Sequence, residues 1–301
     1  MTSFADDRTS GASDVGLAFL VALERWLAVD MSGSGPALRA ALLGWLRAAQ
    51  QAQPTLALVH QLAARALEVV DTGLARGDMA AGLRAALAQS CEAERNDLTA
   101  ARRAVARQAT VLVTERGGWI ATLSASSVVR DAVIEAHRAG REPRALVAES
   151  RPLYEGRTLA AALAAAGVPV WLVVDAALPL LLSQAHMVWL GADAVTDQGV
   201  FNKLGSFAAA LAAREHSVPV YALAGRRKFM PAATGALKIV EMPAAEVWDT
   251  PAAGVQPRNV YFERVPLPLL RGVVVEDSVL PPGETAALAR ERPLPGELAG
   301  G

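Results

Sequence analysis

The sequence predicts an α/β protein in which an all-helical N-terminal domain precedes a doubly wound parallel sheet. In the first third of the 301-residue chain, apolar residues recur at helical spacing. From residue 109 onward, short β-branched runs alternate with helical segments, which indicates a parallel sheet covered on both faces. We expect a disordered tail over residues 1–13, a helical domain over 14–108, the sheet domain over 109–280 and a second tail over 281–301.

Helices account for the first part of the chain. Leu17, Leu20, Val21 and Leu27 follow i, i+3, i+4 spacing behind Asp14, a residue type typical of a helix N-cap. The glycine-rich stretch 31–36 ends this helix because it breaks the periodic pattern. Further helices are expected over residues 37–49, 54–73 and 79–108.

The second part alternates between strands and helices. Strands are expected over residues 110–114, 119–123, 145–148, 170–174, 187–190 and 218–223. Helices are expected over residues 126–139, 158–166, 179–184 and 202–216. Ligands of such sheets bind beyond the carboxyl ends of the strands. The polar residues that follow three of these strands, 149–151, Asp193 and Lys228, should therefore meet at one edge.

Composition excludes several classes of function. A formal net charge of -1 and scattered basic residues give no signal for nucleic acid or an anionic membrane as partner. The single cysteine, Cys91, excludes a disulfide within one chain or a thiolate zinc site, and we expect it to be a packed side chain. The four histidines lack metal-ligand spacing, so no metal site is expected. The sequence has neither a GxGxxG nor a Walker A motif, so a nucleotide cofactor is not supported.

Targeting signals are not visible either. The N-terminus is polar and acidic, without the basic and apolar regions of a signal peptide. The longest apolar stretch, 168–182, is interrupted by Pro169, Asp175 and Pro179 and is too short to span a bilayer. We expect a cytoplasmic protein.

Asp193 is the leading candidate for a chemical role. It follows the apolar run 187–190 and should be partly desolvated at the edge of the sheet. A carboxyl group there has a raised pKa and can transfer protons, although a loop or helix-capping aspartate is the alternative. Asn202 and Lys203, expected at a helix start, can bind an anion through their side chains and the free backbone N–H groups.

Two further segments supply basic residues. Arg151, in the polar loop after the strand 145–148, can make a bidentate contact with phosphate or be a surface arginine. Lys228 follows the strand 218–223 and can be a second phosphate contact or a solvated charge.

Four segments in this order resemble one family. ESRPLYEGR, GADAVTDQGVFNKLGS, RRKF and VQPRNVYFERVP are similar to segments of the alpha, beta and delta subunits of translation initiation factor 2B. The same family contains methylthioribose-1-phosphate isomerase and ribose-1,5-bisphosphate isomerase. The resemblance covers most of the chain, from the second helix to about Pro282.

The resemblance implies a helical domain joined to a Rossmann-like domain and a homodimer or larger homo-oligomer. The ligand it implies is a small phosphorylated sugar or nucleotide-like molecule. In the isomerase branch it implies conversion of an aldose 1-phosphate to a ketose 1-phosphate without a cofactor, with a cysteine and an aspartate managing the proton transfers. That aspartate matches Asp193, and the substrate-binding residues match Arg151, Asn202, Lys203 and Lys228.

The chain departs from the isomerases at three places. The position of the catalytic cysteine is matched by Ser124, whose hydroxyl is far less acidic than a thiol. Two phosphate-binding arginines of the helical domain are also missing, since their nearest matches are Ser32-Gly33 and Gln53-Pro54-Thr55. The alternatives are therefore a sugar-phosphate isomerase that uses Asp193 and Ser124, or a non-catalytic binding protein like the regulatory subunits of initiation factor 2B.

Overall fold

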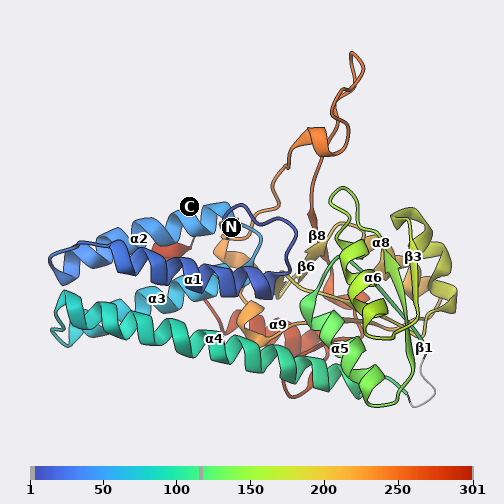
Figure 1. Ribbon diagram of the computed structural model, residues 1–301, viewed down its shortest axis with the longest axis horizontal. Helices are drawn as coiled ribbons and strands as arrows, with labels where there is room; N and C mark the ends of the chain where they lie inside the picture. The colour runs from blue at the N-terminus through green and yellow to red at the C-terminus, as the bar shows by residue number, and fades with distance from the viewer. Residues whose placement is uncertain (1–3, 115–117, 300–301) are drawn as a thin grey trace.

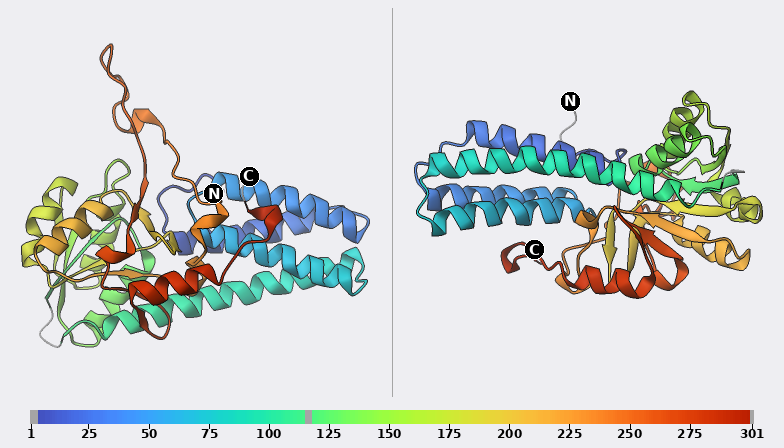
Figure 2. Two further views of the ribbon diagram at one scale, coloured as in Figure 1. Left: turned by 180° about the vertical axis from the view of Figure 1, so that it is seen from behind. Right: turned by 90° about the horizontal axis from the view of Figure 1, so that it is seen from below.

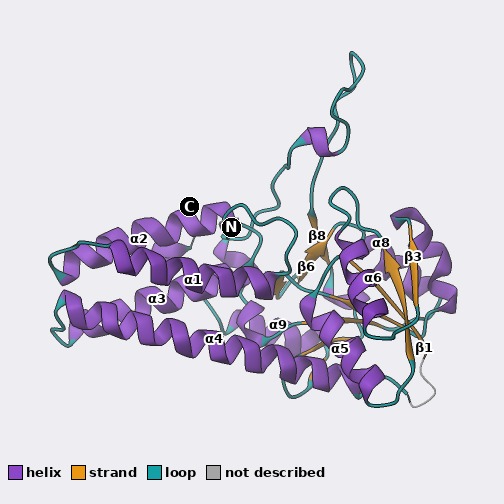
Figure 3. Ribbon diagram, viewed as in Figure 1, coloured by secondary structure: helices purple, strands orange, loops and turns teal. Residues whose placement is uncertain are grey.

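The computed structural model describes residues 4–114 and 118–299. A bundle of long helices stands beside a compact α/β part, and the segment before β8 projects away from both (Figure 1). This arrangement confirms the predicted fold class, and Figure 3 shows the helices and strands separately. No helix in the described residues is long and apolar enough to cross a membrane.

The helices are α1 (Ala12–Val29), α2 (Gly35–Ala52), α3 (Ala57–Ala75), α4 (Ala80–Thr110), α5 (Ser127–Arg138), α6 (Glu155–Ala165), α7 (Leu178–Leu181), α8 (Ser206–Glu215) and α9 (Pro282–Arg290). The strands are β1 (Gly118–Leu123), β2 (Pro143–Ala148), β3 (Val170–Val173), β4 (Met187–Leu190), β5 (Ala194–Thr196), β6 (Gly199–Lys203), β7 (Val220–Leu223), β8 (Phe262–Val265), β9 (Gly272–Val274) and β10 (Val279–Leu280).

The helical part is held by one apolar core. Leucines on the inner faces of α1 to α4, such as Leu23, Leu42 and Leu87, are at most 1% exposed. Ser34 caps α2 by accepting a hydrogen bond from the backbone N–H of Ala37, which satisfies one of the donors that every helix start leaves unpaired. Burial of these leucines, at about 25 cal/mol per Å² of apolar surface, stabilises the bundle.

The main sheet has the strand order β10-β9-β7-β4-β1-β2-β3 in the described part of the chain, and all neighbours pair in parallel except β10 with β9. Consecutive side chains of a strand point to opposite faces of the sheet and so pack into different cores. Ile120 packs with α4, α5 and α6, whereas Ala121 packs with α7, α8 and α9. Both faces of the sheet are therefore covered, so a ligand can bind only at the carboxyl edge of the strands.

A second, three-stranded sheet was not predicted. Strands β5 and β6 form an antiparallel hairpin, and β8 pairs with β6. Asn202 and Lys203 are therefore the last residues of β6, not the start of a helix, and α8 begins at Ser206. The sequence pattern misled because the strand and the helix are separated by only two residues, Leu204 and Gly205, and Gly205 adopts a positive φ of 101°.

The predicted strand 110–114 is also wrong. Thr110 is the last residue of α4, and its hydroxyl donates to the carbonyl of Ala106 at 3.0 Å. This bond back to the preceding turn lets a β-branched residue continue the helix. The first strand is β1, which agrees with the predicted strand 119–123.

Both predicted tails are structured where the structure describes them. Phe4 is buried against Phe19 and Trp45, and α1 begins at Ala12, before the predicted cap Asp14. Residues 282–290 form α9 on the sheet, and the chain then returns to the helical bundle (Figure 2). Each segment carries too few apolar residues for a pattern, yet each completes a core formed by other elements. Residues 1–3 and 300–301 lie outside the described part.

Candidate functional site

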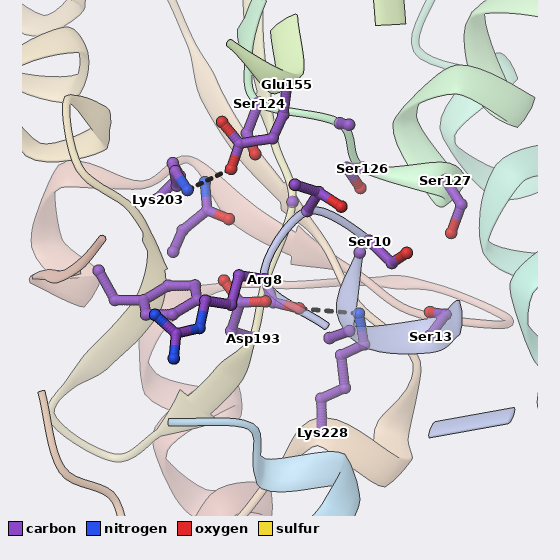
Figure 4. Close-up of a pocket in the computed structure, with 18 residues that line it drawn as sticks. Arg8, Ser10, Ser13, Ser124, Ser126, Ser127, Glu155, Asp193, Lys203 and Lys228 are labelled. Atoms are coloured by element: carbon purple, nitrogen blue, oxygen red, sulfur yellow. Dashed lines mark hydrogen bonds and ion pairs between the residues drawn. The ribbon is translucent and has the colours of Figure 1, made fainter. Parts of the chain in front are cut away.

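A polar cavity lies where the carboxyl ends of β1 and β4 meet the start of α1 (Figure 4). Its volume is about 40 Å³. It is lined by Arg8, Thr9, Ser10, Gly11, Ala12, Ser13, Ser124, Ala125, Ser126, Ser127, Glu155, Gly191, Ala192, Asp193, Asn202, Lys203, Lys228 and Phe262. The structure thus gathers five of the six predicted site residues, at the edge of the sheet where they were expected.

Asp193 lies between the two parts of the molecule. Its backbone N–H donates to Phe201 at 2.8 Å, and its carbonyl accepts from the N–H of Ala57, the first residue of α3, at 3.0 Å. Burial raises the pKa of its carboxyl group to about 6, although Lys228 and Lys203 oppose the rise. A carboxyl group with this pKa gives up and takes back protons near neutral pH.

Lys228 approaches the cavity from the short helix 226–228 that follows β7. It is buried, and its ammonium donates to the carbonyl of Ala192 at 2.7 Å. Burial lowers the pKa of Lys228, and the charge of Asp193 works against this effect. The Lys228 amine is therefore a buried group held next to Asp193 and not a solvated charge.

Lys203 is paired more completely. Its ammonium contacts the carboxylate of Glu155, the first residue of α6, and both side chains are 4% exposed. The same ammonium lies 4.3 Å from the centre of the Tyr261 ring. Since Glu155 already balances its charge, Lys203 offers a phosphate less attraction than the sequence suggested. Glu155 was not predicted as a site residue, although it lies within the ESRPLYEGR segment that carries the family resemblance.

Asn202 shapes the wall of the cavity. Its side-chain amide donates to the hydroxyl of Ser206 at 2.9 Å, which joins the end of β6 to the start of α8. Its carbonyl oxygen would lie 3.3 Å from a Cβ atom added at Gly191, and Ser126 would lie 2.9 Å from the same atom. A side chain at position 191 would therefore displace both cavity walls.

Ser124 directly follows β1 in a left-handed conformation, with φ at 64°. Its backbone N–H donates to the hydroxyl of Ser150 at 2.7 Å, so it is fixed to the loop after β2. No thiol replaces it, because Cys91 is buried in the core of the helical part. This confirms the packing role predicted for Cys91, and burial raises the pKa of its thiol to about 12.

Arg151 is the predicted site residue that does not line the cavity. Asp175 fixes its loop by accepting the backbone N–H groups of Ser150 and Arg151, each at 2.7 Å. The guanidinium is exposed and turns to the Tyr154 hydroxyl and the carbonyl of Val247. The loop was placed correctly, but the direction of its side chain depends on these contacts, which the sequence does not reveal.

Residues 8–13, expected to be disordered, form one side of the cavity. They lead into the N-terminus of α1, which faces the N-terminus of α5, and a Cβ atom at Gly11 would lie 3.1 Å from the carbonyl of Ala125. The first N–H groups of a helix have no partner inside the helix and favour anions. Two such helix starts at one cavity suit a phosphate group. The sequence signal was Gly11-Ala12 directly before the periodic apolar residues.

The two segments that lack the arginines of the isomerases lie at different distances from the cavity. Ser32-Gly33 lies in the connection between α1 and α2, outside the residues that line the cavity. Gln53 lies close to the site, and its side-chain amide donates to the backbone carbonyls of Phe4 at 2.8 Å and Asp7 at 2.9 Å. Gln53 therefore fixes the segment that carries residues 8–13.

A larger cavity of about 480 Å³ adjoins the polar one. Both are lined by Arg8, Ser10, Asp193 and Phe262. The larger cavity also has apolar walls from Val15, Leu56 and Met242. Its volume falls in the range of about 300–1,000 Å³ that is usual for small-molecule sites. Among the described residues, no group of three or more His, Cys, Asp or Glu side chains is arranged to hold a metal ion.

Comparisons with known sequences agree on one family. The model of the initiation factor 2 subunit family matches residues 8–282. Methylthioribose-1-phosphate isomerase of Gemmatimonas aurantiaca is 31% identical over 92% of this chain and 83% of its own length. An eIF-2B subunit 2-like protein of Pyrococcus furiosus is 35% identical, but the match spans 56% of this chain and 60% of that protein. Ribose 1,5-bisphosphate isomerase of Archaeoglobus fulgidus is 32% identical over 58% of each chain.

Solved structures share the fold. Translation initiation factor eIF-2B of Pyrococcus horikoshii superposes with a TM-score of 0.80 at 25% identity, covering 93% of this chain and 94% of that one. 5-Methylthioribose 1-phosphate isomerase of the same organism gives a TM-score of 0.75 at 20% identity, covering 95% and 84%. At this identity the second likeness concerns the fold alone.

Proposed function

Because this chain belongs to the initiation factor 2 subunit family, we propose that its polar cavity binds a phosphorylated pentose. The observation that carries the proposal is the meeting of two helix N-termini, from α1 and α5, with Lys203, Lys228 and Asp193 around one cavity. Helix N-termini favour a phosphate group, the two lysines offset the charges of Glu155 and Asp193, and a carboxyl group accepts hydrogen bonds from sugar hydroxyls. The adjoining larger cavity offers room for the rest of the sugar.

For catalysis, the proposal assigns the proton transfer to Asp193. Conversion of an aldose 1-phosphate to a ketose 1-phosphate opens the ring and moves a hydrogen from C2 to C1, so one proton must leave a hydroxyl and one must reach the ring oxygen. A pKa of about 6 allows Asp193 to exchange protons near neutral pH. The neighbouring Lys228 stabilises the carboxylate once the proton has left.

A second candidate is binding without turnover, as a regulatory protein. The observation that favours it is Ser124, which stands where the isomerases have their cysteine. A serine hydroxyl is a much weaker acid than a thiol, and neither proton transfer nor nucleophilic chemistry is open to it without a base beside it. The backbone N–H of Ser124 is held by the Ser150 hydroxyl.

Calorimetry tests whether the cavity binds a phosphorylated pentose, and NMR tests whether the pentose is converted. Purified protein is titrated with methylthioribose-1-phosphate, with ribose 1,5-bisphosphate and with unphosphorylated ribose, and ketose formation is followed by NMR. Heat with either phosphate and none with ribose supports the site. Ketose formation that is lost in Asp193→Asn and kept in Ser124→Ala supports the isomerase. Binding without ketose supports the regulatory protein, and no heat with either phosphate contradicts the proposal.

For assembly, we propose a homo-oligomer. Edge strand β3 exposes Trp171 and Leu172, and the projecting segment before β8 exposes Trp248. Exposed apolar groups of this kind support an association surface. Light scattering coupled to size exclusion gives the mass directly, and a mass of 31.4 kDa across the accessible concentration range would contradict the proposal.

A further inference from the structure

We propose that Arg8 binds the phosphate group of the ligand and that Gln53 positions it. The inference rests on the proposed function, because it names the residue that recognises the phosphate. Arg8 is exposed and lines both the polar cavity and the larger one, as does Asp193 (Figure 4). A guanidinium at this junction can reach a phosphate in the polar cavity and form two parallel hydrogen bonds with it.

The charges of the cavity favour Arg8 over the lysines. Three cationic side chains line the polar cavity in the described chain, and two of them are buried. Lys203 is neutralised by Glu155, and Lys228 is turned to the carbonyl of Ala192. With Glu155 and Asp193 also present, the buried charges nearly cancel once Asp193 is ionised. A dianionic phosphate therefore gains most of its charge-charge attraction from Arg8.

The segment that carries Arg8 is fixed on both sides. Before it, Gln53 binds the carbonyls of Phe4 and Asp7, and Phe4 is buried in the helical core. After it, the carboxylate of Asp7 accepts the backbone N–H groups of Thr9 at 3.1 Å and Ser10 at 2.9 Å. The backbone of Arg8 therefore enters binding already ordered, so the complex loses less conformational entropy than with a mobile chain end.

Tyr261 orients the side chain. It is 1% exposed, and its hydroxyl donates to the carboxylate of Glu246. Burial and Glu246 raise the pKa of Tyr261, whereas a hydrogen bond with Arg8 lowers it. Arg8 is thus held toward the wall that also carries Phe262. When the ligand binds, the Arg8 guanidinium exchanges the neutral Tyr261 hydroxyl for the charged phosphate group.

The test is calorimetric titration of ribose 1-phosphate into the full chain and its variants. We expect Arg8→Ala to weaken binding about 30-fold, because it removes charge-assisted hydrogen bonds, and Arg8→Lys to weaken it about fivefold. The control is Arg138→Ala, since Arg138 is exposed at the opposite end of α5 from the cavity; it should bind within about twofold of the parent chain. Thermal unfolding of each variant checks that the fold is intact.

The positioning role of Gln53 is tested by a measurement that a purely structural role would not affect. We expect Gln53→Ala to weaken binding about fivefold in the parent chain but less than about twofold in the Arg8→Ala variant, because its effect passes through Arg8. Equal losses in both backgrounds would overturn the positioning role. If the parent chain binds ribose 1-phosphate and Arg8→Ala binds it equally well, the inference about Arg8 is wrong and the proposed function stands. If the parent chain binds no pentose phosphate, both are wrong.

Discussion

Lys203 and Glu155 form an ion pair whose two side chains are each 4% exposed to solvent. The pair joins the last residue of β6 to the first residue of α6, so two elements that are far apart in the sequence meet beside the cavity. Removal of one member leaves the other charge buried without a partner.

We therefore predict that Lys203→Ala lowers the free energy of unfolding by about 3–5 kcal/mol. The double variant Lys203→Met/Glu155→Gln removes both charges and should cost less than the sum of the two single changes. Urea unfolding followed by circular dichroism measures the parent chain, Lys203→Ala, Lys203→Met, Glu155→Gln and the double variant. An unchanged urea midpoint for Lys203→Ala would show that the pair does not stabilise the fold.

The raised pKa of Asp193 predicts a pH dependence of stability. The folded chain holds this proton up to a pKa of about 6, whereas the unfolded chain releases it near 3.8. Between these values the folded state binds more protons, so the free energy of unfolding falls as pH rises from about 4 to 6 and levels above that. The contribution is on the order of 3 kcal/mol.

The matched variant for this test is Asp193→Asn, which cannot titrate at this position. The difference in unfolding free energy between the parent chain and the variant should change by that amount between pH 4 and pH 7, with the parent chain favoured at the acid end. A difference that stays constant over this range would mean that Asp193 has an ordinary pKa.

Gly156 permits a close backbone contact at the start of α6. A Cβ atom there would lie 1.8 Å from the carbonyl oxygen of Ala148, the last residue of β2. We expect Gly156→Ala to destabilise the chain by about 3 kcal/mol or more, because backbone atoms must move. The control is Gly44→Ala in the middle of α2, where nothing lies within 4 Å, and it should stabilise by about 0.5–1 kcal/mol. Equal midpoints in thermal unfolding would contradict this contrast.

Phe4 anchors the segment that leads to the cavity. Its ring lies 5.6 Å from that of Phe19 and 6.0 Å from that of Trp45. We expect Phe4→Ala to raise hydrogen exchange across residues 8–13 at least tenfold while exchange in β4 stays unchanged, since only the segment is released. Mass spectrometry of exchanged peptides measures both regions. Unchanged exchange over 8–13 would mean that Gln53 alone holds the segment.

Much of the fold could be predicted because its patterns are local. The periodic leucines of the bundle and the β-branched runs of the main strands each lie within one element. The helical part, the alternation of strands and helices up to β4 and the edge that holds Asp193 therefore followed from the sequence. Asn202 and Lys203 reached the cavity although their secondary structure was predicted wrongly. They end the second strand of the hairpin that starts directly after Asp193, and the pairing of Ala194 with Phe201 brings them back beside Asp193.

The features that could not be predicted from the sequence depend on contacts between distant segments. Phe4 is one aromatic residue in a polar stretch, and its burial becomes visible only when α1 and α2 supply the rings around it. Arg151 is turned away from the cavity by Tyr154 and by a carbonyl of the projecting segment. Glu155 lies in the ESRPLYEGR segment, but its role arises from Lys203, which is 48 residues away in the chain.

The hydrogen bond from Ala57 to the carbonyl of Asp193 gives the cavity a mechanical property. The residue at its centre is also a joint between the bundle and the sheet. Any rotation of the bundle would strain this bond and shift Asp193 relative to Lys228 and Lys203, whose charges oppose the rise of its pKa. We therefore expect a force applied to the helices to be converted into a change of acidity inside the cavity.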